Sequence, residues 1–258
     1  MPVPQNTFKA ALKAGEIQFG CWVGLANAFS TEMMGQAGFD WLVIDAEHGP
    51  NDLRTILSQL QVLASTNAHP VVRVPIGETY MIKQVLDAGA QTILVPMVES
   101  AEQARQLVRD VTYPPHGDRG VGYALARASN FSVIADYGKT ADAQICLLVQ
   151  VENLRGLAAL DDILAIDGVD GVFIGPADLA ADMGHIGNAD HPDVQAAIMD
   201  ALGRIRTAGK APGILSTRDA MTNDAISAGA QFVAVGADIL LLGDAARGLA
   251  QKWQSTKA

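Results

Sequence analysis

Short apolar runs alternate along the chain with amphipathic stretches of helical period. One phrase recurs, in which a helix ends near a glycine, one or two residues follow, and a short apolar run begins: QAGFDWLVID, DAGAQTILVP, IDGVDGVFIG and SAGAQFVAVG. A glycine suits the left-handed position after a helix, and each apolar run is too short for a surface helix. The pattern therefore predicts that helices and strands alternate.

The remaining units bring the predicted strands to eight, near 17–24, 41–47, 69–75, 92–98, 144–152, 170–175, 211–216 and 231–236. Apolar strands separated by helices indicate a parallel sheet, and eight of them close a (β/α)8 barrel. An open doubly wound sheet is the alternative, but FGCWVGLANAFS, around the end of the first strand, lacks the expected G-x-G-x-x-G spacing. We expect a single α/β domain, a (β/α)8 TIM barrel, over residues 1–258.

One segment interrupts this alternation. Residues 113–137 (YPPHGDRGVGYALARASNFSVIADY) are rich in Pro and Gly and show no clear period. Long irregular loops in compact domains are usually functional. We expect a lid or an oligomer contact beside an active site, with a disordered insertion as the alternative.

Composition excludes several classes of partner. The formal net charge is −10, and Arg204 with Arg206 is the only close basic pair along the chain, so we expect no nucleic-acid and no membrane partner. No apolar run approaches the roughly 18 residues of a membrane helix, and the N-terminus lacks the apolar core of a signal peptide, which predicts a cytoplasmic protein. Cys21 and Cys146 lie inside apolar runs and are expected to be buried rather than catalytic.

Polar side chains gather where the predicted strands end. In chain order they are Asp45, Glu47, His48, Arg73, Gln150, Glu152 and Asp178. The C-terminal ends of barrel strands meet at one rim, where barrel enzymes hold their active sites. We therefore expect these side chains to converge.

Glu152 and Asp178 follow adjacent predicted strands. Two carboxylates that face each other in a dry site repel unless a cation or a shared proton lies between them. A bound metal is one solution, and ion pairs with Arg155 or Arg73 are the other. Because the chain has no HxxxH, HxH or CxxC pattern, the carboxylates favour a hard divalent ion, Mg²⁺ or Mn²⁺, with Co²⁺ as a further option.

Three other features of this rim suggest chemistry. His48 is the only one of five histidines at a strand end there, and we interpret it as catalytic rather than as a core or capping residue. Arg73 follows apolar residues and needs a partner, either Asp45 or an anionic substrate oxygen. The turn from Gly175 to Asp178 begins a helix whose backbone N–H groups suit a substrate carboxylate.

The lysines argue against one rival chemistry. An aldolase that forms a Schiff base needs a lysine at the active rim. The chain has seven lysines, and none lies at the C-terminal end of a predicted strand.

With these motifs assembled, nearly the whole chain resembles the HpcH/HpaI family of class II pyruvate-dependent aldolases, especially 4-hydroxy-2-oxo-heptanedioate and related hydroxy-keto-acid aldolases. The motifs that carry the resemblance are, in order, Gly20-Cys-Trp22, Asp45-Ala-Glu-His48, Arg73-Val-Pro75, Pro96 with Glu99, Arg119-Gly120, Gln150-Val-Glu152 and Gly175-Pro-Ala-Asp-Leu179.

The resemblance implies a role for each residue. Glu152 and Asp178 would be the metal ligands, and Arg73 would anchor the substrate and its enolate. His48 would be the acid/base residue, supported by Asp87, and Asp45 would lie one layer behind. The residues implied to contact substrate are Trp22, Arg73, Gln150, Gly175, Pro176, Ala177, Asp178 and Leu215.

The implied reaction is reversible aldol cleavage of 4-hydroxy-2-oxo acids to pyruvate and an aldehyde, through a metal-stabilised pyruvate enolate. Family members are usually hexamers in which the loop matching 113–137 reaches a neighbouring subunit's site, so we expect a homo-oligomer.

Two alternatives stay open. An acyl-CoA lyase of the malyl-CoA or citryl-CoA type, or a phosphoenolpyruvate enzyme, would need a basic phosphate groove, for which Arg119 and Arg127 are the candidates. The acidic total charge argues against that reading. A non-catalytic keto-acid-binding protein would bind pyruvate with a metal but show no turnover.

Overall fold

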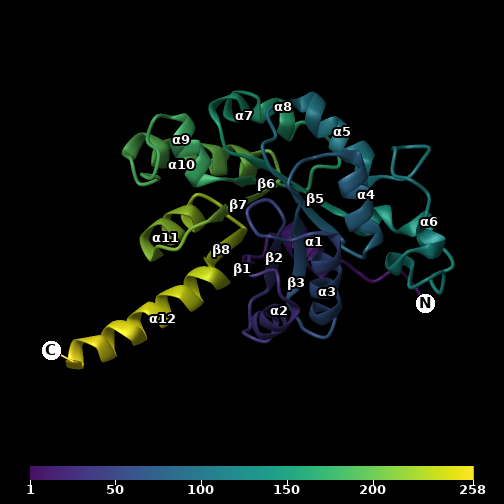
Figure 1. The fold of residues 1–258 in the computed structure, drawn as a ribbon. Coiled ribbons are helices and arrows are strands. Elements are labelled where there is room, and N and C mark those ends of the chain that lie inside the picture. Colours follow the sequence, from purple (N-terminus) through teal and green to yellow (C-terminus); the bar gives the residue numbers. More distant parts are fainter. Residues whose placement is uncertain (258) are drawn as a thin grey trace.

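A computed structural model describes residues 1–257, so the last residue of the predicted domain, 258, lies outside the described residues. Eight parallel strands within this range close into a barrel in sequence order (Figure 1). They are β1 (Gln18–Val23), β2 (Trp41–Asp45), β3 (His69–Arg73), β4 (Thr92–Val95), β5 (Cys146–Val151), β6 (Gly171–Ile174), β7 (Ala211–Leu215) and β8 (Phe232–Ala237). The predicted (β/α)8 barrel is confirmed.

Helices connect the strands and cover the outside of the barrel (Figure 1). They are α1 (Thr7–Ala14), α2 (Ala28–Gly35), α3 (Leu53–Leu63), α4 (Thr79–Asp87), α5 (Ala101–Val111), α6 (Tyr137–Thr140), α7 (Leu154–Ala158), α8 (Leu160–Leu164), α9 (Pro176–Asp182), α10 (Pro192–Thr207), α11 (Asp219–Ser227) and α12 (Asp238–Gln254). No helix within residues 1–257 combines the length and the apolar character needed to cross a bilayer.

The barrel interior is filled by aromatic side chains from several strands. Trp41 and Phe232 lie 5.9 Å apart, centroid to centroid, and Phe8 of α1 packs 5.6 Å from Trp41. Helix α1 therefore covers the N-terminal end of the barrel. Both cysteines are buried and free, as expected, and burial raises the pKa of the Cys21 thiol to about 12.

The irregular segment 113–137 is packed against the N-terminal end of the barrel. It connects α5 to β5, and Arg127 donates hydrogen bonds to the carbonyls of Ala88 and Leu60 near the ends of α4 and α3. Tyr113 and Tyr137 form a small core of their own with Ile134. The segment is therefore not a lid over the C-terminal rim of its own chain, and the expected oligomer contact stays a prediction.

The interior packing gives a test of how tightly the barrel is filled. Gly213→Ala should lower the free energy of unfolding by about 1–3 kcal/mol, because a Cβ at Gly213 would lie 2.2 Å from the Phe232 ring. Gly203→Ala in α10 is the matched control, since nothing lies within 4 Å of its Cβ position. Alanine there should stabilise by about 0.5–1 kcal/mol. Urea denaturation followed by tryptophan fluorescence measures both, and equal effects would contradict the packing argument.

Candidate active site

A cavity of about 200 Å³ opens at the C-terminal ends of the strands. Its lining comprises Trp22, His48, Arg73, Gln150, Glu152, Phe173, Gly175, Pro176, Ala177, Asp178 and Leu215. The structure thus brings together every residue predicted to contact substrate, both predicted metal ligands and His48. Of the predicted site residues, Asp45 and Asp87 do not line this cavity.

Arg73 is held by two carboxylates from the end of β2. Its Nε and Nη2 donate to Asp45 Oδ1 and Oδ2 at 2.8 and 2.7 Å, and its Nη1 lies 2.7 Å from Glu47 Oε2. Its side chain is only 8% exposed, and its guanidinium lies 5.3 Å from the centroid of the Trp22 ring. The ion pair with Asp45 that the sequence left open is therefore present, and Arg73 lines the cavity as well.

The two carboxylates beside Arg73 differ in their ionisation. Burial opposes the charge on Asp45, but the hydrogen bonds and charge of Arg73 hold its pKa below the usual value. The N–H of Glu47 also donates to Asp45 Oδ1 at 3.0 Å. Burial raises the pKa of Glu47, although Arg73 partly opposes this effect. Asp45 is thus the fixed counterion of Arg73, and Glu47 is the more readily protonated partner.

Glu152 is buried, and no cationic side chain among residues 1–257 pairs with it. Gln150 Nε2 donates to its Oε2, and the N–H of Met97 donates to its Oε1 at 3.0 Å. Burial raises the pKa of Glu152, and the charges of Asp178 and Glu47 raise it further. Neither arginine considered from the sequence pairs with it, since Arg155 binds Glu99 at 2.9 Å and Arg73 binds Asp45 and Glu47.

This surrounding fits a divalent cation. A buried carboxylate whose charge is not balanced, with a second carboxylate in the same cavity, gains most from a bound positive ion. Gly175 leaves the necessary room, since a Cβ there would lie 2.3 Å from Glu152 Oε2. Met97 adopts a left-handed φ of +54°, an uncommon conformation for a non-glycine residue, while it donates to Glu152. Backbone and side chains thus converge on this carboxylate.

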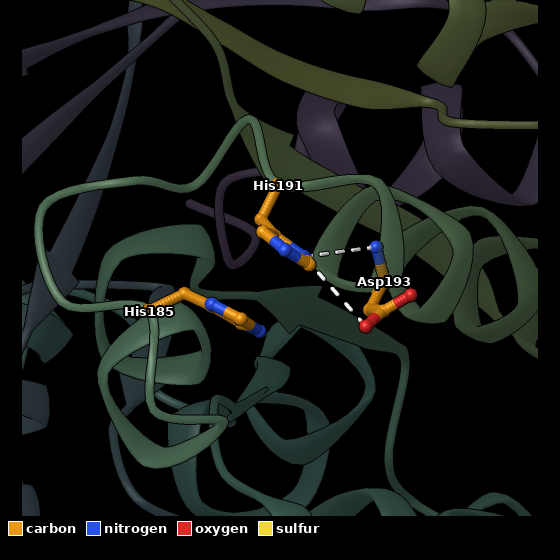
Figure 2. A group of neighbouring side chains, drawn as sticks. All are labelled: His185, His191 and Asp193. Atoms are coloured by element: carbon orange, nitrogen blue, oxygen red, sulfur yellow. Dashed lines mark hydrogen bonds and ion pairs between the residues drawn. The ribbon is translucent and has the colours of Figure 1, made fainter.

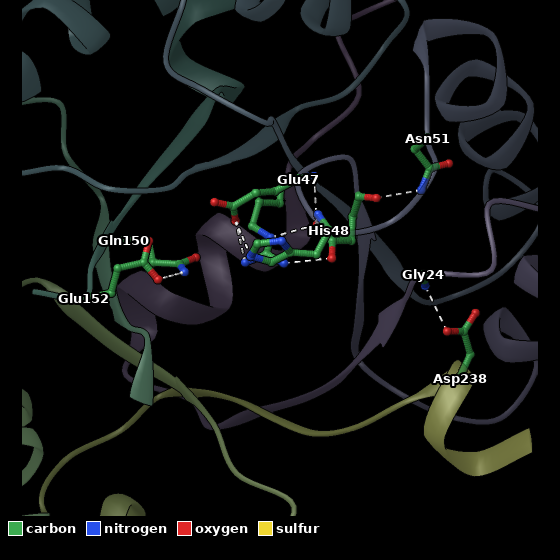
Figure 3. A network of polar contacts seen from close by, with 9 residues as sticks. Gly24, Glu47, His48, Asn51, Gln150, Glu152 and Asp238 are labelled. Atoms are coloured by element: carbon green, nitrogen blue, oxygen red, sulfur yellow. Dashed lines mark hydrogen bonds and ion pairs between the residues drawn. The ribbon is translucent and has the colours of Figure 1, made fainter. Parts of the chain in front are cut away.

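His48 lies at the mouth of the cavity. Its side chain is 67% exposed, and its Nε2 lies 3.8 Å from Glu47 Oε2 (Figure 3). Asp87, which was expected to support His48, does not contact it within one chain. Asp87 ends α4, which runs back from the C-terminal rim, and it accepts a hydrogen bond from the fully buried Arg119 at 3.2 Å.

Sequence reasoning missed two contributors to the site, Phe173 and Met97, and gave a third, Glu47, no role. Glu47 was visible in the motif Asp45-Ala-Glu47-His48, but nothing in the sequence assigned its contact with Arg73. Phe173 adds an aromatic wall and carried only the signal of a buried strand residue. Met97 acts through its backbone N–H, which leaves no mark on residue type.

A basic cluster exists in space that the sequence did not indicate. Lys9, Lys13, Arg206 and Lys210 line a separate cavity of about 540 Å³ near the N-terminal ends of β6 and β7. The two cavities share no lining residue, and Arg73 is the only lysine or arginine in the lining of the smaller one. This cluster therefore does not supply a phosphate groove to the candidate active site.

A closed eight-stranded barrel with a polar cavity at the C-terminal ends of its strands defines a (β/α)8-barrel enzyme. Residues 18–245 match the model of the HpcH/HpaI aldolase/citrate lyase family. The chain belongs to this family.

Known relatives extend over almost the full chain. A hydroxypyruvate/pyruvate aldolase of Roseobacter denitrificans is 59% identical, over 98% of this chain and 99% of its own length. A 4-hydroxy-2-oxo-heptane-1,7-dioate aldolase of Salmonella dublin is 53% identical, over 98% and 96%. The crystal structure of an HpcH/HpaI aldolase/citrate lyase family protein from Burkholderia cenocepacia superposes with a TM-score of 0.93, at 40% identity over 97% of this chain and all of that one. The predicted family and the enzyme class, a carbon–carbon lyase, are confirmed.

The ion pair behind the cavity has a consequence for stability. Asp45→Asn should lower the free energy of unfolding at pH 7 by about 3–5 kcal/mol, because it leaves the buried Arg73 with one carboxylate fewer. Folding lowers the pKa of Asp45, so its contribution is complete above the ordinary aspartate pKa of about 3.9 and is lost as pH falls through the folded value. The difference between parent and variant should therefore narrow below about pH 4.

Denaturant titrations at several pH values measure this difference. Asp118→Asn is the control, since the Asp118–Arg109 pair has the same bidentate geometry but lies on the surface. That substitution should change stability little at any pH. A loss for Asp45→Asn that is equally small, or that persists unchanged in acid, would contradict the assignment.

Proposed function

We propose that this chain catalyses the reversible, metal-dependent aldol cleavage of 4-hydroxy-2-oxo acids to pyruvate and an aldehyde. The observation that carries the proposal is the buried, uncompensated Glu152 beside Asp178 in the cavity at the C-terminal rim. The relatives support the substrate class, since their names specify hydroxypyruvate or pyruvate and 4-hydroxy-2-oxo-heptane-1,7-dioate. A small 2-oxo acid is common to these names.

Glu152 and Asp178 would hold the ion, with Mg²⁺, Mn²⁺ or Co²⁺ as the candidates. Once bound, such an ion acts as a Lewis acid that stabilises negative charge developing on the substrate. The cavity then needs further positive potential, because the two carboxylates cancel a divalent charge and the pyruvate enolate carries two negative charges. Arg73 is the lining residue whose N–H groups can stabilise this excess negative charge.

Asp45 and Glu47 change how Arg73 contributes. They already balance its charge, so we infer that Arg73 acts as an oriented hydrogen-bond donor rather than as a free positive charge. Three contacts to carboxylates and the Trp22 ring fix the plane of its guanidinium. Donors preorganised in this way lose little entropy on binding and are worth about 3–4 kcal/mol each on a developing oxyanion.

His48 would take and return the proton of the substrate 4-hydroxyl. Its place at the cavity mouth suits the part of the substrate that leaves as the aldehyde, while pyruvate occupies the deeper, acidic end. Phe173, Leu215 and Trp22 give the wall an apolar character suited to excluding water. The acyl-CoA alternative is less well supported, because the lining offers Arg73 alone to bind phosphates.

Removal of the metal tests the proposal. EDTA should abolish release of pyruvate from a 4-hydroxy-2-oxo acid, and Mg²⁺, Mn²⁺ or Co²⁺ should restore it, as measured by coupling to lactate dehydrogenase. Glu152→Gln should lower turnover at least about 100-fold. Asp182→Asn is the control, since Asp182 lies at the end of α9 and binds the N–H of Leu154. Full turnover in protein shown by elemental analysis to be metal-free would overturn the proposal.

We also propose that the chain works as a homo-oligomer, with a hexamer expected. Helix α12 extends away from the barrel to the C-terminus (Figure 1), and of its seventeen residues only Asp238 is buried. Its large apolar side chains are exposed to 48% or more: Ile239, Leu240, Leu241, Leu242, Leu249 and Trp253. An apolar surface of this extent supports burial against another copy. The cytoplasmic location stays a prediction.

An oligomer would also give Asp87 its expected role. Asp87 lies at the far end of α4 from His48, so it supports a His48 only if that histidine belongs to a neighbouring copy. His48→Ala and Asp87→Asn should then each lose most turnover, and oligomers that contain both chains should regain activity in about a quarter of their sites.

Co-expression of the two variants with different affinity tags isolates these mixed oligomers. Pyruvate release by the doubly purified protein, compared with each single variant, measures the regained activity. Mixed oligomers as inactive as the single variants would contradict a shared site, and a monomer in light scattering would contradict the oligomer itself.

A further inference from the structure

A second group of potential metal ligands lies between α9 and α10. His185, His191 and Asp193 each offer a ligand atom, and these atoms all lie within 4.8 Å of one another. Figure 2 shows the two imidazoles and the carboxylate turned toward one another. None of the three lines the candidate active-site cavity.

The loop that carries these residues is ordered by its own hydrogen bonds. The N–H of His185 donates to the carbonyl of Ala180 at 2.7 Å, the N–H of Asn188 donates to that of His185 at 2.9 Å, and the N–H of His191 donates to that of Asn188 at 3.1 Å. Gly184 and Gly187 supply the left-handed turns, with φ of +83° and +75°. Pro192 then begins α10. The ligand positions are thus set by the backbone before an ion arrives, which lowers the entropy cost of binding one.

The two imidazole rings and the carboxylate lie in direct contact. The two imidazole rings stack with centroids 3.5 Å apart and an interplanar angle of 11°. His191 Nδ1 accepts a hydrogen bond from the N–H of Asp193 at 3.3 Å and lies 3.7 Å from Asp193 Oδ2. Within residues 1–257 the ring of His185 makes no hydrogen bond, so only its stacking on His191 has to change for its lone pair to turn toward an ion.

The donor set selects a different ion from the one expected in the active site. Two imidazole nitrogens with one carboxylate suit borderline transition-metal ions such as Zn²⁺, whose remaining position water can fill. The all-carboxylate pair Glu152 and Asp178 suits hard ions instead. All three side chains retain some exposure, so an aqueous ion can reach them.

The geometry points to a second metal site, in which His185, His191 and Asp193 bind a Zn²⁺-class ion that joins the end of α9 to the start of α10. Helix α9 begins with Pro176, Ala177 and Asp178 of the cavity lining and is only about 10 Å long. The ion therefore fixes the far end of the helix whose first turn lines the cavity. This site does not depend on the proposed function.

Zinc binding in a Glu152→Gln background tests the site, because that substitution weakens binding by the other carboxylate pair. At pH 7.5, isothermal titration with Zn²⁺ should give one ion per chain, and Zn²⁺ should raise the melting temperature. His185→Phe keeps a stacked ring without a ligand, and His191→Asn keeps an acceptor for the Asp193 N–H. Each should weaken Zn²⁺ binding at least about tenfold and remove the rise in melting temperature.

His116→Phe is the matched control, because His116 is an exposed loop histidine outside this group. It should leave both the Zn²⁺ stoichiometry and the thermal shift unchanged. The parent chain in excess Mg²⁺ provides a second measurement, in which His185→Phe should lower bound Zn²⁺ by one ion per chain. Zinc binding that persists in His185→Phe and His191→Asn, or no zinc binding at micromolar concentration, would overturn the proposal. Neither result would bear on aldol cleavage.

Discussion

The packing of aromatic rings inside the barrel determines where chemistry can occur. Phe8, Trp41 and Phe232 fill the N-terminal end, and Trp22 and Phe173 continue the column at 5.3 Å from each other. These last two rings also form part of the cavity lining. The bottom of the cavity is therefore formed by the C-terminal end of the aromatic core. The polar residues of the cavity pack on a rigid apolar surface. Gly20 and Gly213 make this column possible, because any Cβ at either position would collide with the facing ring.

On this floor the charges divide into two groups with different electrostatic character. Arg73 with Asp45 and Glu47 is a self-contained network, in which one cation meets two carboxylates and the one with the raised pKa can take up a proton. Glu152 receives only neutral donors, from Gln150 and the backbone of Met97. The first group orients Arg73 as a hydrogen-bond donor. In the second group, the negative charge of Glu152 has no positive partner. An external cation would balance the charge of the second group.

The barrel and the polar rim were predictable, because burial and strand geometry leave a pattern of apolar and polar residues in the sequence. Eight apolar runs separated by helical stretches predict the barrel, and polar residues at strand ends predict the rim. Other lining residues, such as Trp22 and Leu215, were implied only by the family resemblance. The partners of individual side chains could not be predicted, because they depend on distances between strands. Arg73 had two candidate partners, and its contact with Glu47 appears only in three dimensions. The position of segment 113–137 was not predictable, since its composition indicates irregularity but not the end of the barrel to which α5 delivers it. A lid over the rim of its own chain was therefore the wrong alternative, while the oligomer contact stays a prediction. The basic cavity assembles from Lys9, Lys13, Arg206 and Lys210, which no local pattern connects.

Asp238 joins two regions that lie far apart in the sequence. Its carboxylate accepts the N–H groups of Gly24 and Leu25, just beyond the strand that carries Trp22, and it is also the first residue of α12. The projecting helix is thus hydrogen-bonded, through its first residue, to the loop beside the cavity wall. One carboxylate therefore ties the start of α12 to the loop that follows the strand of Trp22, so the two segments keep a fixed position relative to each other.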